Sequence, residues 1–156
     1  MVAFAGNAGE SGSKADVIRD HMRWIAVQNP SYDGNARLPA VRLVPRKNLF
    51  AMAYEKDIAE VTDAAEGVIL GVYDSDSETV YLPEGFSFSD PKAAHVLVHE
   101  LVHHLQNVAG VTDPTCPEQG EWEAYKIESA FQQERGQEVD PNLLIVAAGL
   151  SMCHDD

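Results

Sequence analysis

The sequence predicts an α+β domain with a small three-stranded, largely antiparallel sheet packed on an N-terminal helix and three later helices. Three observations support this fold class. Apolar residues keep helical spacing near the N-terminus, runs of β-branched and aromatic residues flank a polar turn mid-chain, and a long apolar helix follows them. With 156 residues, 45% of them hydrophobic, the chain can form one sizeable core, so we expect a single domain over residues 15–156.

The N-terminal region divides into a leader and a helix. Residues 1–14 are small, polar and rich in glycine, so we expect a flexible leader there. Ser13 followed by Asp16 resembles a helix cap with an acidic first turn, and apolar residues then recur at helical spacing. The sequence therefore predicts a helix over about 14–29, which Pro30 ends.

Three strands and a short helix are expected in the middle of the chain. Residues 41–44 alternate like a strand, and residues 48–54 are predicted to form a short helix. Residues 67–73 and 79–82 are rich in β-branched and aromatic side chains, and the polar turn 74–78 joins them. This pattern predicts an antiparallel hairpin.

Three further helices are predicted after the hairpin. Asp90 and Pro91 resemble a cap with proline in the first turn, residues 93–108 are apolar almost all round, and Gly110 can end the helix. Such a helix is expected to be buried. A proline and a glycine delimit the next helix, over residues 117–136, and a last helix is expected over 140–150.

The charge of the chain excludes some partners. There are 25 acidic and 11 basic residues, which gives a net charge of −14. This charge argues against nucleic acid or an anionic membrane as the main partner. The apolar stretches are too short to span a bilayer. We therefore expect a monomer with no nucleic-acid partner and no membrane insertion, and a preference for neutral or basic substrates.

The two cysteines, Cys116 and Cys153, lie far apart in the sequence. They could be free core thiols, a disulfide or metal ligands. We favour a disulfide because each lies in a proline-rich or terminal segment that a bridge would tie down. A disulfide would indicate an exported protein, periplasmic or secreted, and free thiols a cytoplasmic one.

The sequence His99-Glu100-Leu101-Val102-His103 carries the strongest functional signal. On a helix, four residues at about 100° each bring His103 to within roughly 40° of His99, one turn along. Both imidazoles can then bind one zinc ion, while Glu100 takes a proton from zinc-bound water as general base. The alternatives are a pair of core or solvated histidines and a glutamate that merely stabilises the site.

A third zinc ligand is expected downstream. The pattern HExxHxxGxxH would supply a third histidine, but Gln106 and Ala109 occupy its glycine and histidine positions. The ligand would then be a glutamate on the following helix, with a small residue one turn later where the two helices approach. Glu121 with Ala124 fits this arrangement.

The neighbouring glutamates fit the arrangement less well. Glu123 would place Lys126 at the contact between the helices, and Glu118 would place Glu121 there. We therefore choose Glu121, while Glu123 stays open as an alternative ligand.

At this point the chain resembles the gluzincins, HExxH metallopeptidases whose third ligand is a glutamate, and especially their small single-domain forms. The resemblance covers about residues 67–130: the hairpin, His99 to His103, and Glu121 to Ala124. It implies that Val68 to Tyr73 form an exposed edge strand along which an extended peptide pairs. The family often has an aspartate four residues after the glutamate to orient a ligand histidine, and Tyr125 occupies that position here.

Other polar residues are assigned less sharply. His95 could line the cleft, but we expect an exposed histidine at the helix end, and His104 should pack away from His103. A hydrolase also needs a donor for the oxyanion. The sequence does not rank the candidates Tyr54, Tyr73, Tyr81, Tyr125 and His154.

These observations together predict a zinc-dependent hydrolase, a peptidase acting on a peptide or protein substrate. Its site would consist of His99, His103 and Glu121 as ligands of one Zn²⁺ and Glu100 as general base. The alternative is a zinc-binding, non-catalytic interaction module of peptidase-like fold, because so short a chain has little room for a second lobe around the cleft.

Overall fold

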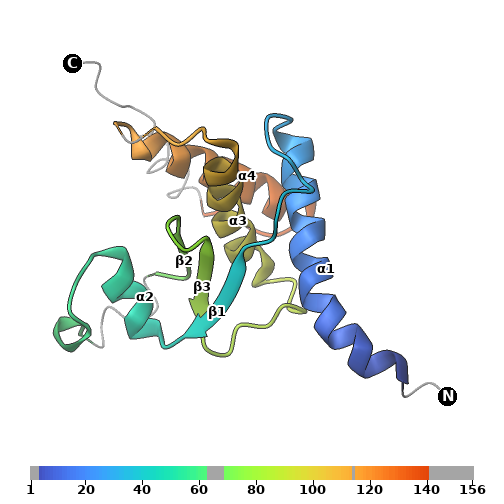
Figure 1. Cartoon of the computed structure of the whole chain (residues 1–156), viewed down its shortest axis with the longest axis horizontal. Coiled ribbons are helices and arrows are strands. Elements are labelled where there is room, and N and C mark those ends of the chain that lie inside the picture. Colours follow the sequence, from blue (N-terminus) through green and yellow to red (C-terminus); the bar gives the residue numbers. More distant parts are fainter. Residues whose placement is uncertain (1–3, 63–68, 114, 141–156) are drawn as a thin grey trace.

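A computed structural model describes residues 4–62, 69–113 and 115–140, with side chains from residue 14 onward. The fold is α+β, as predicted (Figure 1). Its elements, in chain order, are α1 (Phe4–Gln28), β1 (Ala40–Val44), α2 (Arg46–Ala53), the 3₁₀ helix η1 (Ile58–Glu60), β2 (Val72–Asp74), β3 (Thr79–Pro83), α3 (Ala94–Ala109) and α4 (Pro117–Glu134).

The sheet is mixed, with the strand order β1-β3-β2. The predicted hairpin is confirmed, because β2 pairs antiparallel with β3 and Tyr73 lies opposite Val80. Its first strand is shorter than predicted, since β2 begins at Val72 and residues 69–71 lie outside the strand. The prediction of a largely antiparallel sheet is wrong for the other pair, since β1 runs parallel to β3 with Val41 opposite Val80. Parallel neighbours require a long crossover, and the chain between them supplies one by passing through α2, η1 and β2.

The helix bounds differ from the predictions mainly at the N-terminus. α1 begins at Phe4 and so includes most of the segment expected to be a leader. No proline precedes Pro30, so no proline breaks the helix on its N-terminal side, and its first turns point away from the sheet (Figure 1). The helix predicted over 140–150 lies outside the described residues.

α3 is the central element of the core and contacts α1, α4 and the sheet (Figure 1). Its apolar residues are almost fully buried together with side chains from α1, β3 and α4: Met22, Ile25, Val80, Leu82, Leu97, Leu101, Leu105 and Phe131. Each such side chain contributes about 1.5–3 kcal/mol by leaving water. The buried helix predicted here is therefore confirmed.

The ends of α3 and α4 explain where these helices lie. Gly110 adopts a left-handed conformation with φ 68° and ends α3, as predicted. Asp90 accepts a hydrogen bond from the backbone of Lys92 and so caps a turn before α3, which begins only at Ala94. None of the described helices is long and apolar enough to cross a membrane.

Candidate metal centre

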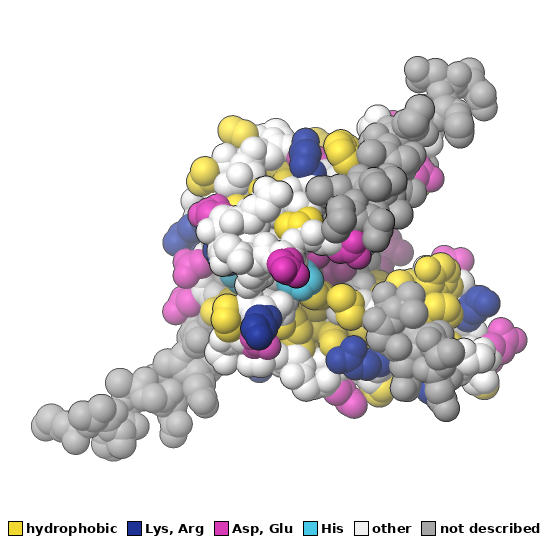
Figure 2. Space-filling model, turned by 180° about the vertical axis from the view of Figure 1, so that it is seen from behind, with side chains coloured by type: hydrophobic (Ala, Val, Ile, Leu, Met, Phe, Trp, Pro, Cys, Tyr) yellow, Lys and Arg dark blue, Asp and Glu magenta, His cyan; other side chains and the backbone are white. Residues whose placement is uncertain are grey.

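Two histidines of α3 face the same cavity. One helical turn separates His99 from His103, and their Nε2 atoms lie 3.3 Å apart. His99 is 9% exposed, so it lies at the inner wall of the cavity. Figure 2 shows histidine surface, in cyan, at the centre of this face of the molecule, beside acidic side chains.

Glu121 of α4 completes the group. Its two carboxylate oxygens lie 3.3 Å from His99 Nε2 and 2.9 Å from His103 Nε2. Ala124, one turn later, is fully buried between the helices, which allows the close approach that the sequence predicted. The structure thus brings His99, His103 and Glu121 together as a group that could hold a metal ion.

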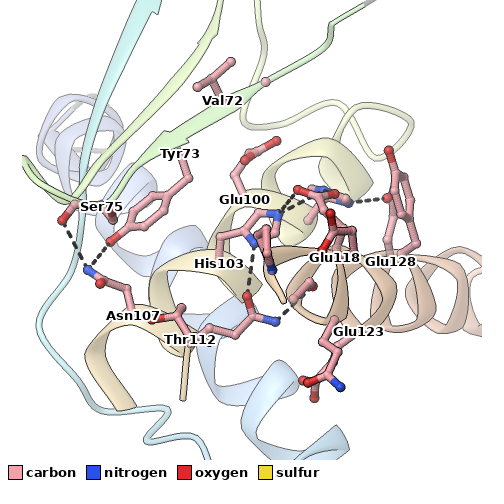
Figure 3. Close-up of a pocket in the computed structure, with 18 of the residues that line it drawn as sticks. Val72, Tyr73, Ser75, Glu100, His103, Asn107, Thr112, Glu118, Glu123 and Glu128 are labelled. Atoms are coloured by element: carbon pink, nitrogen blue, oxygen red, sulfur yellow. Dashed lines mark hydrogen bonds and ion pairs between the residues drawn. The ribbon is translucent and has the colours of Figure 1, made fainter. Parts of the chain in front are cut away.

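Glu123, the alternative ligand, belongs to a different environment. Its carboxylate accepts hydrogen bonds from Asn29 Nδ2 and, at 2.7 Å, from the Tyr32 hydroxyl. Figure 3 shows Glu123 directed away from His103. Among the described residues Glu121 is therefore the glutamate that meets both histidines.

Glu128 binds the Nδ1 atom of His99, on the side of the ring away from Glu121. This carboxylate lies two turns after Glu121 on α4, is 7% exposed, and its Oε2 is 2.8 Å from His99 Nδ1. Its other oxygen is 2.7 Å from His95 Nδ1. Burial raises the pKa of Glu128, but the hydrogen bonds from His95 and His99 outweigh burial and lower it. An ionised carboxylate only accepts, so the Nδ1 of His99 carries a proton and its Nε2 faces the group.

Gln106 accepts a hydrogen bond from the Nδ1 atom of His103, as Glu128 does from that of His99. Its side-chain amide donates from Nε2 to the Gly120 carbonyl oxygen at 3.0 Å, so Oε1 is left to accept from His103 Nδ1 at 3.1 Å. A Cβ atom on Gly120 would lie 3.0 Å from Gln106 Oε1. The glycine therefore makes room for this amide. Sequence reasoning missed both Glu128 and Gln106.

The electrostatics of the group favour positive charge between the three side chains. Burial lowers the pKa of His99, but hydrogen bonds to Glu121 and Glu128 raise it to about 10. Burial raises the pKa of Glu121, and the hydrogen bonds from His103 and His99 bring it well below its usual range. The position can thus accept a proton or a metal ion.

Glu100 lies beside the group at the wall formed by β2. It is 7% exposed, and Figure 3 shows it between His103 and Val72. A Cβ atom on Gly71 would lie 3.0 Å from Glu100 Oε1, so any larger residue there would require this carboxylate to shift by a few tenths of an ångström. Burial raises the pKa of Glu100, and the neighbouring His99 and His103 oppose that rise.

The other histidines of α3 differ from each other. His95, expected to be exposed, instead lines the cavity with 20% of its side chain accessible, because Glu128 binds it. His104 packs away from His103, as predicted. It is fully buried, with Nδ1 3.0 Å from the Tyr73 hydroxyl and Nε2 2.8 Å from the Arg37 carbonyl oxygen.

The positions of the tyrosines relative to the cavity reduce the number of candidate oxyanion donors. Tyr54 and Tyr125 line the cavity, and the Tyr125 ring packs edge-on against His99 at 4.6 Å between centroids. Tyr73 also reaches the cavity, but its hydroxyl is engaged with His104 and Asn107. Tyr81 is absent from the described lining. His154 lies outside the described residues.

The predicted disulfide cannot be followed in the structure. Cys116 is buried, at 5% exposure, immediately before α4. Cys153 lies outside the described residues, so the pairing and the localisation that depends on it stay predictions.

Fold and site together define an α+β domain in which two packed helices carry a two-histidine, one-glutamate group able to hold a metal ion. The chain belongs to the family described as a domain of unknown function, DUF6647, whose model matches residues 10–155. Searches among curated proteins and among solved structures found no match.

Proposed function

We propose that this protein is a zinc-dependent hydrolase, and specifically a peptidase, with Glu100 as its general base. The observation that carries the proposal is the convergence of two imidazole Nε2 atoms and one carboxylate while both Nδ1 atoms are held by protein acceptors. Metal-binding histidines have this arrangement, because a bound Nδ1–H fixes the ring and its tautomer.

The donor set fits zinc in a catalytic site. Imidazole nitrogen suits zinc better than magnesium or calcium, which prefer oxygen alone. Structural zinc sites have four protein ligands, whereas catalytic sites have three and leave one position open. Here the described residues supply three: His99, His103 and Glu121. The resemblance to gluzincins, drawn from the same residues, supports the same assignment.

Glu100 is suited to the role of base. Zinc held here would supply Lewis acidity, which lowers the pKa of water and polarises a carbonyl oxygen. The Glu100 carboxylate, buried beside both histidines, is positioned to take a proton from the attacking water and to pass it to the leaving nitrogen.

The cavity supports a peptide substrate. It measures about 1200 Å³ and opens along β2, an edge strand of the sheet. An extended peptide can add to such an edge through main-chain hydrogen bonds, which brings an amide next to Glu100. None of the described residues that line the cavity is lysine or arginine, and six are acidic: Glu100, Asp113, Glu118, Glu121, Glu123 and Glu128. Neutral or basic peptides should therefore be preferred.

The test combines metal content with cleavage of a peptide library. Wild type should bind one zinc per chain and cleave a subset of peptides. Glu100→Gln should retain the zinc and lose at least about 100-fold in kcat/KM, because proton transfer contributes 10²–10⁴-fold. Glu118→Gln is the matched control, since it neutralises an exposed carboxylate on the same cavity and should keep both properties.

Three outcomes would contradict the proposal. Cleavage that survives Glu100→Gln would exclude the assigned base. Stoichiometric zinc without cleavage of any peptide would instead indicate the alternative, a zinc-binding module that does not turn over substrate. No bound zinc, even after reconstitution, would exclude both.

A further inference from the structure

Amide hydrolysis at this site needs a hydrogen-bond donor for the substrate oxygen. When water adds to the carbonyl carbon, the C=O bond becomes a single bond and its oxygen acquires negative charge. Glu100 takes the proton of the water and later delivers it to the nitrogen as the C–N bond breaks. A donor aimed at the developing oxyanion lowers the barrier of the first step.

The described tyrosines differ in their freedom to act as this donor. The Tyr73 hydroxyl is already bonded to His104 and Asn107, at 3.0 and 3.1 Å. Tyr54 is 53% exposed and packs on Phe50, so it lies at the rim of the cavity. Tyr125 is half-buried and lines the cavity itself.

Tyr125 is also fixed relative to the metal-binding group. It follows Glu121 by one turn of α4, so the two side chains lie on the same face of that helix. Its ring meets the His99 ring at 4.6 Å with an interplanar angle of 63°. Within the part of the chain that the structure describes, the Tyr125 hydroxyl has no hydrogen-bond partner. The packing therefore orients the ring and leaves the O–H for a substrate.

We propose that Tyr125 is a further catalytic residue, whose hydroxyl donates a hydrogen bond to the substrate oxyanion from α4, while Glu100 acts from α3. This inference rests on the proposed hydrolase function. It also explains a tyrosine at the position where gluzincins often have an aspartate: here Glu128 binds His99 Nδ1 at 2.8 Å, so residue 125 is not needed for that role.

The test is Tyr125→Phe in the full, zinc-loaded chain. Phenylalanine keeps the ring contact with His99 and removes only the oxygen, so the zinc affinity should equal that of wild type. With a peptide that wild type cleaves, kcat should fall about 100-fold or more while KM changes little, as for loss of one oxyanion donor. Tyr54→Phe, the matched control, should keep wild-type kcat.

A binding measurement makes the inference independent of turnover. Acetohydroxamate, a small zinc-binding anion, should bind zinc-loaded Tyr125→Phe at least about 10-fold more weakly than wild type or Tyr54→Phe, by calorimetry. Equal affinity, or an unchanged kcat where wild type is active, would overturn the role of Tyr125 and leave the peptidase proposal intact. A weaker zinc affinity in Tyr125→Phe would also overturn it, because the hydroxyl would then support the metal site. Absence of cleavage by wild type would count against the peptidase alone.

Discussion

Adjacent residues of α3 form two contrasting histidine environments. His103 donates from Nδ1 to the Gln106 side chain and presents Nε2 to the cavity. The next residue, His104, must donate from Nε2, because its partner there is the Arg37 carbonyl oxygen, and it accepts at Nδ1 from the Tyr73 hydroxyl. The two rings are therefore opposite tautomers on different faces of one helix.

The contrast shows what separates a structural histidine from a candidate ligand. Burial does not distinguish the two kinds of histidine, because His104 is completely buried and His99 nearly so. The hydrogen-bond partners of the ring nitrogens distinguish them. Both nitrogens of His104 have neutral protein partners, and burial lowers its pKa, so it stays uncharged. His99 and His103 each have one nitrogen bound by the protein and the other facing a shared carboxylate, which is the pattern of a metal centre.

Removal of the shared carboxylate should have the largest effect. Glu121→Ala deletes one of the three proposed ligand side chains, so the zinc affinity should fall by more than the roughly 10–100-fold typical of outer partners. Competition with a chelator would measure this change. The control Glu123→Ala truncates a carboxylate bound to Asn29 and Tyr32 and should keep the zinc affinity. Equal losses of zinc affinity in both variants would mean that the affinity depends on the overall negative charge of the cavity and not on Glu121 as a ligand.

Neutralising the residue behind His99 should have an intermediate effect. Glu128→Gln weakens the acceptor at His99 Nδ1, and the zinc affinity should fall about 10–100-fold. His95→Phe removes the other partner of Glu128 but leaves the bond to His99, so it should bind zinc like wild type. A similar loss in both variants would indicate that His95 itself supports the metal.

The smallest effect is expected on the structural side of α3. Tyr73→Phe leaves the buried Nδ1 of His104 without its donor, which should lower the free energy of unfolding by about 1–3 kcal/mol. Denaturant unfolding would measure this loss, and the zinc affinity should be unchanged. Tyr81→Phe removes a strand hydroxyl without a hydrogen-bond partner among the described residues and should be near neutral. A loss of zinc affinity in Tyr73→Phe would show that the environments of His103 and His104 depend on each other.

Local sequence spacing was enough to predict the inner group of the site. His99 and His103 lie one turn apart on any helix, and Ala124 marked the contact that selects Glu121. The supporting residues were missed because they depend on tertiary placement. Glu128 lies seven residues after Glu121, two turns along the same face, so a signal was available. Nothing local indicated that Gln106 would reach Gly120.

For the sheet, too, the sequence predicted the local elements but not their tertiary arrangement. Alternating side chains identified the strand at residues 41–44, and the turn identified the hairpin. The alternation does not reveal which strand becomes the partner or in which direction it runs. The parallel pairing of β1 with β3 depends on the path of the intervening chain, which no short motif encodes.

The backbone at Gly71, immediately before β2, limits the space of the Glu100 carboxylate. Because a Cβ atom at residue 71 would lie 3.0 Å from Glu100 Oε1, a single methyl group there would require the carboxylate to shift by a few tenths of an ångström. The freedom of Glu100 to swing is thus set by the backbone of a neighbouring element.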